Sequence, residues 1–154
     1  MNIRSYTDDD LPAVLDIYAR SKLDELIYES EHFELLALEQ DQLRLSQLME
    51  SDIFVYDDDG VIAYGALFGS EIRALFVHPN NRGCGLGKLL LSHLLSQARR
   101  PASLSVAKSN IPAKNLYQNF GFKVVDEFET SYNGVRVLAN KMECIEHLPH
   151  TSGE

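Results

Sequence analysis

The stretch Arg82-Gly83-Cys84-Gly85-Leu86-Gly87-Lys88 lies between an apolar segment, Ile72–Val77, and a leucine-rich segment that begins at Leu89. The apolar segment has the β-branched and aromatic residues of a buried strand, and the leucines recur at helical spacing. Three glycines in five residues at a strand-to-helix junction leave backbone N–H groups exposed at the positive end of a helix dipole. The stretch therefore predicts an anion cradle, and a phosphate group is the anion that we expect there.

Length and composition indicate one globular domain. The chain has 154 residues, and a domain of this size buries roughly 70% of its unfolded surface. Its content of 45% hydrophobic and 24% charged residues is ordinary for a soluble protein. No apolar run approaches the length of a membrane span, and the N-terminus has no signal-peptide core. The two cysteines, Cys84 and Cys144, are far apart, so we expect no disulfide framework and a cytoplasmic location.

The formal net charge is −9, which argues against a general nucleic-acid binder because such proteins carry a basic face. Negative charge also steers cationic molecules toward a protein, so it mildly favours a small cation or a basic peptide as partner. The alternative explanation is that the acidity only keeps the protein soluble.

The hydrophobic pattern predicts alternating strands and helices in one α/β domain with helices on both faces of a mixed sheet. The pairs Asp59-Gly60 and Asn133-Gly134 separate apolar runs and predict two hairpins. Residues 145–154 contain few apolar residues and are expected to form a flexible tail after a domain of residues 1–144. The expected helices are 11–21, 34–50, 86–98 and 111–119, and the expected strands are 3–6, 53–56, 61–68, 72–77, 104–106, 122–130 and 135–142.

Two common phosphate-binding motifs do not match the glycine stretch. A P-loop needs Ser or Thr after Gly-Lys to ligate magnesium, and Leu89 stands there. A dinucleotide-binding loop needs glycine where Lys88 stands, and it opens the first strand–helix–strand unit, whereas this stretch lies in the middle of the chain. Magnesium-nucleotide and dinucleotide sites are therefore both excluded.

The pattern Arg-x-x-Gly-x-Gly at residues 82–87 resembles the acetyl-coenzyme A loop of the GNAT superfamily of N-acetyltransferases. The preceding Leu75-Phe76-Val77-His78-Pro79 is similar to the strand and turn of that family. Asn110–Phe122, written Asn-x-x-Ala-x-x-Leu-Tyr-x-x-x-Gly-Phe, resembles its second block. The resemblance extends over residues 1–143 and implies a single α/β domain with a mixed, mostly antiparallel sheet.

This resemblance also implies a function. It implies transfer of an acetyl group from acetyl-CoA to a primary amine of a small molecule, peptide or protein, by direct attack in a ternary complex. It implies no metal, no nucleic acid or membrane partner, and a possible homodimer. The alternative is a GNAT-like module that senses acetyl-CoA, or binds a partner, without turnover.

The cofactor-binding residues follow from the matched positions. The resemblance implies that the backbone of the glycine stretch binds the pyrophosphate and that Arg82 and Lys88 add positive charge, while Cys84 fills a variable position. The edge of the strand 72–77, which precedes the glycine stretch, would pair with the pantetheine arm. Asn110 would cap the helix expected at 111–119 and contact the arm. The predicted cofactor-binding residues are Phe76, Val77, Arg82, Gly83, Cys84, Gly85, Leu86, Gly87, Lys88 and Asn110.

Two residues are predicted to carry the proton transfers. Tyr117 matches the tyrosine of the second block and would protonate the departing thiolate; alternatively, its ring only packs the helix on the sheet. Glu71 has the spacing of the strand glutamate that some members use as a base, and a water is the alternative. Tyr28, His32 and Phe33 are expected to border the acceptor pocket.

Overall fold

The computed structural model describes residues 2–144, which form one sheet of seven strands in the order β1-β2-β3-β4-β5-β7-β6. Neighbouring strands are antiparallel except β4 and β5, which are parallel. The predicted mixed, mostly antiparallel sheet is therefore confirmed. The expected tail, residues 145–154, lies outside the described residues. The strands are β1 Ile3–Ser5, β2 Asp52–Asp57, β3 Val61–Phe68, β4 Glu71–Val77, β5 Ala102–Ala107, β6 Lys123–Tyr132 and β7 Val135–Cys144.

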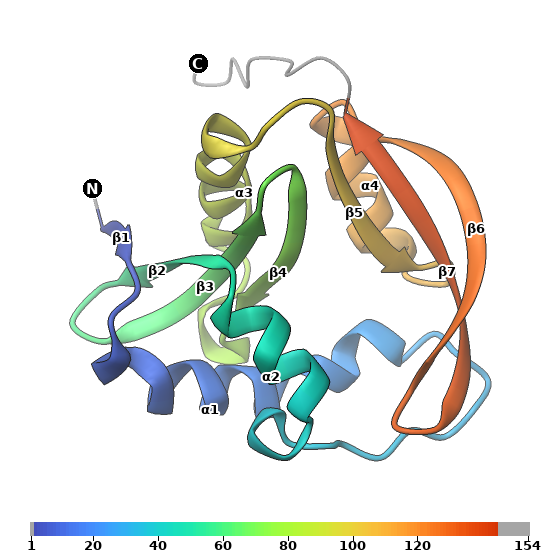
Figure 1. Ribbon diagram of the computed structural model, residues 1–154, viewed down its shortest axis with the longest axis horizontal. Coiled ribbons are helices and arrows are strands. Elements are labelled where there is room, and N and C mark those ends of the chain that lie inside the picture. Colours follow the sequence, from blue (N-terminus) through green and yellow to red (C-terminus); the bar gives the residue numbers. More distant parts are fainter. Residues whose placement is uncertain (1, 145–154) are drawn as a thin grey trace.

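Helices cover both faces of the sheet, as predicted (Figure 1). On one face, α1 and α2 pack on the sheet around a core that includes Val14, Leu48 and Tyr64. On the other face, α3 and α4 enclose a core that includes Leu91 and Met142. The helices are α1 Leu11–Ser21, α2 Gln42–Met49, α3 Leu86–Gln97 and α4 Ile111–Asn119, with 3₁₀ segments at Asp8–Asp10, Lys22–Leu26, Leu38–Gln40 and Pro79–Asn81.

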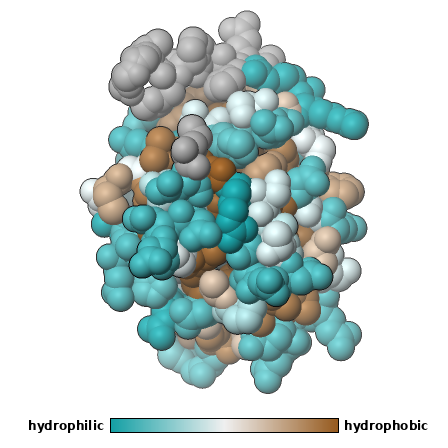
Figure 2. Space-filling model, turned by 90° about the vertical axis from the view of Figure 1, so that its left-hand side faces the viewer, coloured by the Kyte–Doolittle hydropathy of each residue, from teal (hydrophilic) through white to brown (hydrophobic). Residues whose placement is uncertain are grey.

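The surface seen in Figure 2 is mainly hydrophilic, with hydrophobic residues visible in gaps between polar ones. This distribution is typical of amphipathic elements that bury one apolar face. Within residues 2–144, no helix is long and apolar enough to cross a membrane.

The helix predicted over residues 34–50 is wrong in its first half. The α-helix in this region begins only at Gln42, after the side chain of Asp41 accepts a hydrogen bond from the Arg44 amide. Upstream, the backbone is extended and bound to the β6–β7 hairpin. The Leu36 amide donates to the Tyr132 hydroxyl at 2.8 Å, and the Asn133 side chain donates to the Glu34 carbonyl at 3.1 Å. Contacts with the hairpin therefore override the helical pattern here.

The start of α1 is fixed to the edge of the sheet by an ionic cluster. The two Nη atoms of Arg4 each donate to one carboxylate oxygen of Asp10 at 2.8 Å, and Nη2 also donates to Asp57 at 2.9 Å. The hydrogen bonds that Asp10 accepts, above all those from Arg4 and also that from the Thr7 amide at 2.8 Å, lower the pKa of Asp10 from 3.8 to about 2. The cluster positions the helix that leads into the 3₁₀ segment Lys22–Leu26.

The parallel strands β4 and β5 separate soon after they pair. Their register contains one pair of residues, Glu71 with Ser103. Towards Val77 the two strands diverge, as Figure 1 shows. This divergence leaves the far edge of β4 without a neighbouring strand and opens the sheet next to the start of α3.

Candidate active site

A groove of about 440 Å³ occupies the gap between the diverging strands. This volume lies within the range of about 300–1,000 Å³ that is usual for ligand pockets. The groove is lined by residues of β4, β5 and α4, by Ser21, Asp24 and Glu25, and by the glycine stretch with the first residues of α3. The two sequence blocks that carry the resemblance therefore lie on opposite sides of one groove.

The backbone of the glycine stretch is free to bind an anion. Within the described residues, none of the amides of residues 83–88 donates a hydrogen bond to a backbone carbonyl. Gly83 and Gly85 have φ values of 85° and 82°, and a Cβ built on either would meet no atom within 4 Å. Side chains therefore do not block these amides, which lie at the positive end of the α3 dipole. The residues fit the pyrophosphate of coenzyme A.

The last residue of β4, Val77, turns its peptide groups away from β3 and lines the groove. The amide of His78 donates to Ile62 in β3, so the alternation of an antiparallel ladder directs the peptide groups of Phe76 to β3 and those of Val77 away from it. Consistent with this, the Val77 carbonyl accepts hydrogen bonds from Ser21 Oγ at 3.3 Å and Arg82 Nε at 3.2 Å. Of the two residues predicted to bind pantetheine through the backbone, only Val77 has the required orientation; Phe76 lines the groove but pairs with β3.

The remaining predicted cofactor residues divide into two groups. Arg82 and Asn110 line the groove together with Gly83, Gly85, Leu86 and Gly87, whereas Cys84 and Lys88 do not. Arg82 Nη1 is bound to the Asp24 carboxylate at 2.7 Å. Asn110 is the N-cap of α4, as predicted, because its side chain accepts a hydrogen bond from the Ala113 amide. The sequence did not predict that Asp24 lines the groove and pairs with Arg82.

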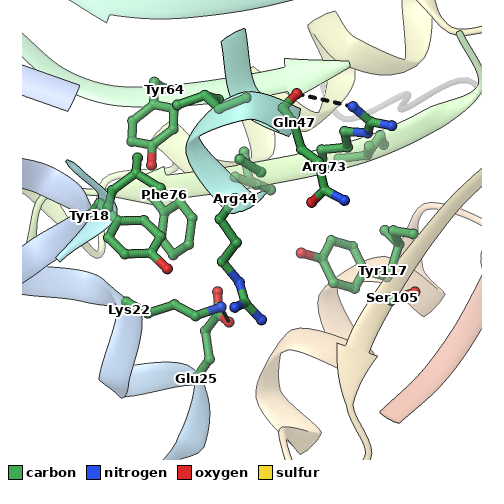
Figure 3. Close-up of a pocket in the computed structure, with 16 residues that line it drawn as sticks. Tyr18, Lys22, Glu25, Arg44, Gln47, Tyr64, Arg73, Phe76, Ser105 and Tyr117 are labelled. Carbon is green, nitrogen blue, oxygen red and sulfur yellow. Dashed lines mark hydrogen bonds and ion pairs between the residues drawn. The ribbon is translucent and has the colours of Figure 1, made fainter. Parts of the chain in front are cut away.

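A second cavity, of about 190 Å³, adjoins the groove (Figure 3). We call it the acceptor cavity, after the role that we propose for it below. Its walls come from α1, the 3₁₀ segment Lys22–Leu26, α2, and strands β3, β4 and β5. Polar side chains from several elements point into it, among them Tyr18, Lys22, Glu25 and Arg44. The residues that line both the cavity and the groove are Glu25, Leu75, Phe76, Ser105 and Tyr117.

Tyr117 packs against Phe122 and also lies at the junction of the two cavities, the place where the groove and the acceptor cavity share lining residues. Its ring makes an edge contact with Phe122, with centroids 5.9 Å apart. Its hydroxyl points into the acceptor cavity and makes no hydrogen bond within residues 2–144 (Figure 3). Burial, and to a smaller extent the negative charge of Glu25, raises the pKa of this hydroxyl. Tyr117 is therefore protonated at neutral pH and available as a proton donor.

Glu71, the predicted base, lies at the opposite end of β4 from the glycine stretch. Its carboxylate accepts a hydrogen bond from Arg73 Nε at 2.9 Å, and it lines neither the groove nor the acceptor cavity. Glu25 lines both instead, and its carboxylate accepts a hydrogen bond from Lys22 Nζ at 3.0 Å. The structure therefore does not bring Glu71 to Tyr117, but it does bring Glu25 there.

The three residues expected around the acceptor are also elsewhere. Tyr28 and His32 are exposed, Phe33 is buried in a separate apolar cluster, and none of them lines the acceptor cavity. From this part of the chain, the lining of the acceptor cavity comes instead from Tyr18, Lys22 and Glu25. The structure therefore brings none of these three residues to the groove or to the adjoining cavity.

Comparison with known proteins agrees with the groove and its loop. The family model for the acetyltransferase (GNAT) domain matches residues 49–124. The chain is 35% identical over 77 residues to the peptidyl-lysine N-acetyltransferase YjaB of Escherichia coli; the match covers 50% of this chain and 52% of YjaB, about half the length of that relative. It is 30% identical over 129 residues to the peptidyl-lysine N-acetyltransferase YiaC of Escherichia coli, covering 80% of this chain and 84% of YiaC.

The fold is also that of solved acetyltransferases. The structure of yncA from Salmonella typhimurium, determined with its cofactor acetyl-CoA, superposes with a TM-score of 0.65 at 24% identity and covers 97% of this chain and 96% of yncA. The match to YiaC covers most of both proteins, and the family model matches the segment that builds the groove. The chain belongs to the GNAT superfamily of acetyltransferases.

Proposed function

We propose that the protein transfers an acetyl group from acetyl-CoA to a primary amine in a ternary complex. The observation that carries the proposal is the junction of two cavities: the groove, which the loop 83–88 with its free backbone amides borders, and the acceptor cavity, which shares Glu25 and Tyr117 with the groove. The yncA structure of the same fold contains acetyl-CoA, and YjaB and YiaC are named as N-acetyltransferases. These likenesses support the same chemistry here.

The groove residues would hold acetyl-CoA through the backbone. The amides of residues 83–88 would bind the pyrophosphate, with Arg82 exchanging its Asp24 partner for a phosphate oxygen. The groove-facing peptide of Val77 would pair with the pantetheine arm, and Asn110 would hold the start of α4 beside it. Acetyl-CoA would supply the thioester carbonyl that the amine attacks and the thiolate that leaves.

Two side chains at the junction would move the protons. An ammonium must lose a proton before its nitrogen can attack, and Glu25 is the carboxylate that lines both cavities, so we assign it the role of proton acceptor, directly or through a water. Tyr117 holds its proton at neutral pH and would donate it to the departing sulfur. In this proposal Glu25 replaces Glu71, which is bound to Arg73 at the other end of β4.

The alternative, a module that only senses acetyl-CoA, is not favoured. Such a module requires the groove, but it requires neither a second cavity nor Glu25 and Tyr117 at the junction.

Release of the coenzyme A thiol in the presence of amines tests the proposal. The Tyr117→Phe variant should lower kcat by roughly a hundredfold or more, with the dissociation constant of acetyl-CoA nearly unchanged in calorimetry. Tyr28→Phe, on an exposed tyrosine outside both cavities, is the matched control. Full turnover in the Tyr117→Phe variant would remove the tyrosine from the mechanism, and failure of the wild type to bind acetyl-CoA would overturn the proposed function.

A further inference from the structure

The acceptor cavity contains a buried hydrogen-bond donor that the described residues do not satisfy. Tyr18 is 4% exposed and lines the cavity, and its hydroxyl has no hydrogen-bond partner. Burial raises the pKa of this hydroxyl, so it stays an O–H donor at neutral pH. Leaving such a donor unpaired destabilises the folded protein, and phenylalanine would fill the same space without that cost. The hydroxyl therefore indicates a bound molecule that supplies an acceptor.

Positive charge lies next to this hydroxyl. The side chain of Lys22 is 15% exposed and pairs with Glu25, while Arg44 Nη1 binds Asp41 at 3.1 Å. The heads of Lys22 and Arg44 converge in the cavity beside the Glu25 carboxylate (Figure 3). Asp41 does not line the cavity. The groups that converge there are thus two cations and one carboxylate.

A third cation of the lining, Arg73, is committed elsewhere. Its Nε donates to Glu71, and its Nη1 donates to the Glu50 carboxylate at 2.5 Å and to the Gln47 carbonyl at 3.0 Å. Neither glutamate lines the cavity. Arg73 is thus paired with two carboxylates, whereas Lys22 and Arg44 are paired with one each, so Arg73 contributes least of the three to recognition of an acceptor.

We propose that the acceptor is a small amine that also carries a carboxylate, as a free amino acid does. Its carboxylate accepts the hydrogen bond of Tyr18 and lies near Lys22 and Arg44, and its ammonium lies on Glu25, next to Tyr117. This proposal rests on the proposed transfer reaction and specifies its substrate.

Other amines match the cavity less well. A polyamine brings only positive charge to a lining in which cations outnumber the carboxylate, and it offers no acceptor to Tyr18. A lysine side chain of a protein brings one ammonium and likewise no anion. The volume of about 190 Å³ is below the usual range of drug-sized pockets and suits a molecule as small as an amino acid.

The test compares acceptors that differ only in the carboxylate. Thiol release from acetyl-CoA is measured with each common L-amino acid and with its carboxamide, and with spermidine and a lysine-containing peptide. We expect at least one amino acid to exceed its carboxamide in kcat/KM by tenfold or more, because the carboxamide accepts only a weaker, uncharged hydrogen bond and loses the attraction of the two nearby cations. Spermidine or the peptide as the best acceptor, or carboxamides equal to the acids, would overturn the proposal while leaving the transfer reaction intact.

Variants locate the recognition in the cavity. Tyr18→Phe should lower kcat/KM for the preferred amino acid about tenfold and lower that for its carboxamide less, because the uncharged carboxamide oxygen accepts a weaker hydrogen bond from Tyr18 than the carboxylate does. Because the lost hydroxyl has no hydrogen-bond partner within residues 2–144, Tm should not fall. The control Tyr28→Phe should change neither rate. An equal loss for acid and carboxamide in Tyr18→Phe would contradict the assigned contact.

A binding measurement separates this proposal from the proposed function. The Tm of the protein with coenzyme A present should rise with the preferred amino acid and not with its carboxamide. If acetyl-CoA does not bind at all, the proposed function fails. If acetyl-CoA binds but no amino acid raises Tm more than its carboxamide does, the amino-acid proposal fails alone.

Discussion

Replacing Asp10 with asparagine should destabilise the protein by about 2 kcal/mol at pH 7, and the loss should disappear in acid. Asp10 is 7% exposed and receives both Nη atoms of Arg4, which lowers its pKa from 3.8 to about 2. At 1.36 kcal/mol per pKa unit, this difference corresponds to about 2.4 kcal/mol. Because the folded-state pKa is lowered, the stabilisation is complete above pH 3.8 and is lost as the pH falls through about 2.

Urea denaturation of the wild type and Asp10→Asn between pH 2 and pH 7 measures this difference. The free energies of unfolding should differ by about 2 kcal/mol at pH 7 and converge near pH 2. Asp9→Asn is the matched control, since Asp9 lies in the same 3₁₀ turn but is exposed and forms no ion pair with Arg4. If the difference stays constant across this range, or if Asp9→Asn loses as much stability, the ion pair between Arg4 and Asp10 is not the source of the stabilisation.

Three further predictions concern the site and the core. Gly85→Val should abolish acetyl-CoA binding in calorimetry, because a side chain at a φ of 82° is strained and projects into the open groove; normal affinity would place the pyrophosphate elsewhere. Glu25→Gln should lower kcat at pH 7 roughly a hundredfold while Glu71→Gln stays near the wild type, and the reverse order would restore Glu71 as the base. Gly65→Ala should cost about 1–3 kcal/mol in urea denaturation, since its Cβ would lie 2.8 Å from Leu94 Cδ1; unchanged stability would show that α3 can move away from β3.

Local signals predicted the central elements well. The strand expected at 61–68 and the helix expected at 111–119 coincide with β3 and α4. Both have strong local boundaries: a hairpin turn at Asp59-Gly60 before β3, and the Asn110 cap and Gly121 around α4, with Gly121 at a φ of 95°. Where the chain itself supplies its turns and caps, the sequence is sufficient to predict the element.

Elements that depend on distant contacts were predicted less well. Residues 34–37 have a helical pattern, but the Tyr132 hydroxyl and the Asn133 side chain bind their backbone and hold it extended. These partners lie almost a hundred residues further along the chain, in the β6–β7 hairpin. No local pattern in residues 34–37 shows that competition.

The candidate site shows the same division. The loop 83–88, Val77, Asn110 and Tyr117 line the groove or supply its free amides, and their motifs predicted them. Glu25 was missed because it lies in a short 3₁₀ segment without periodic or motif signal, and only the packing of α1 on the sheet brings it to the junction. A spacing along β4 suggested Glu71, but a strand separates its two ends by about 3.3 Å per residue, so that end lies away from the loop.

Titration of ¹⁵N-labelled protein with acetyl-CoA tests most directly whether the backbone of residues 83–88 binds the cofactor. We expect the amide resonances of these six residues and of Val77 to shift together and to saturate at the affinity measured by calorimetry, and we expect no such shifts in the Gly85→Val variant. Saturable shifts confined to other parts of the protein, with the amides of residues 83–88 unchanged, would contradict it.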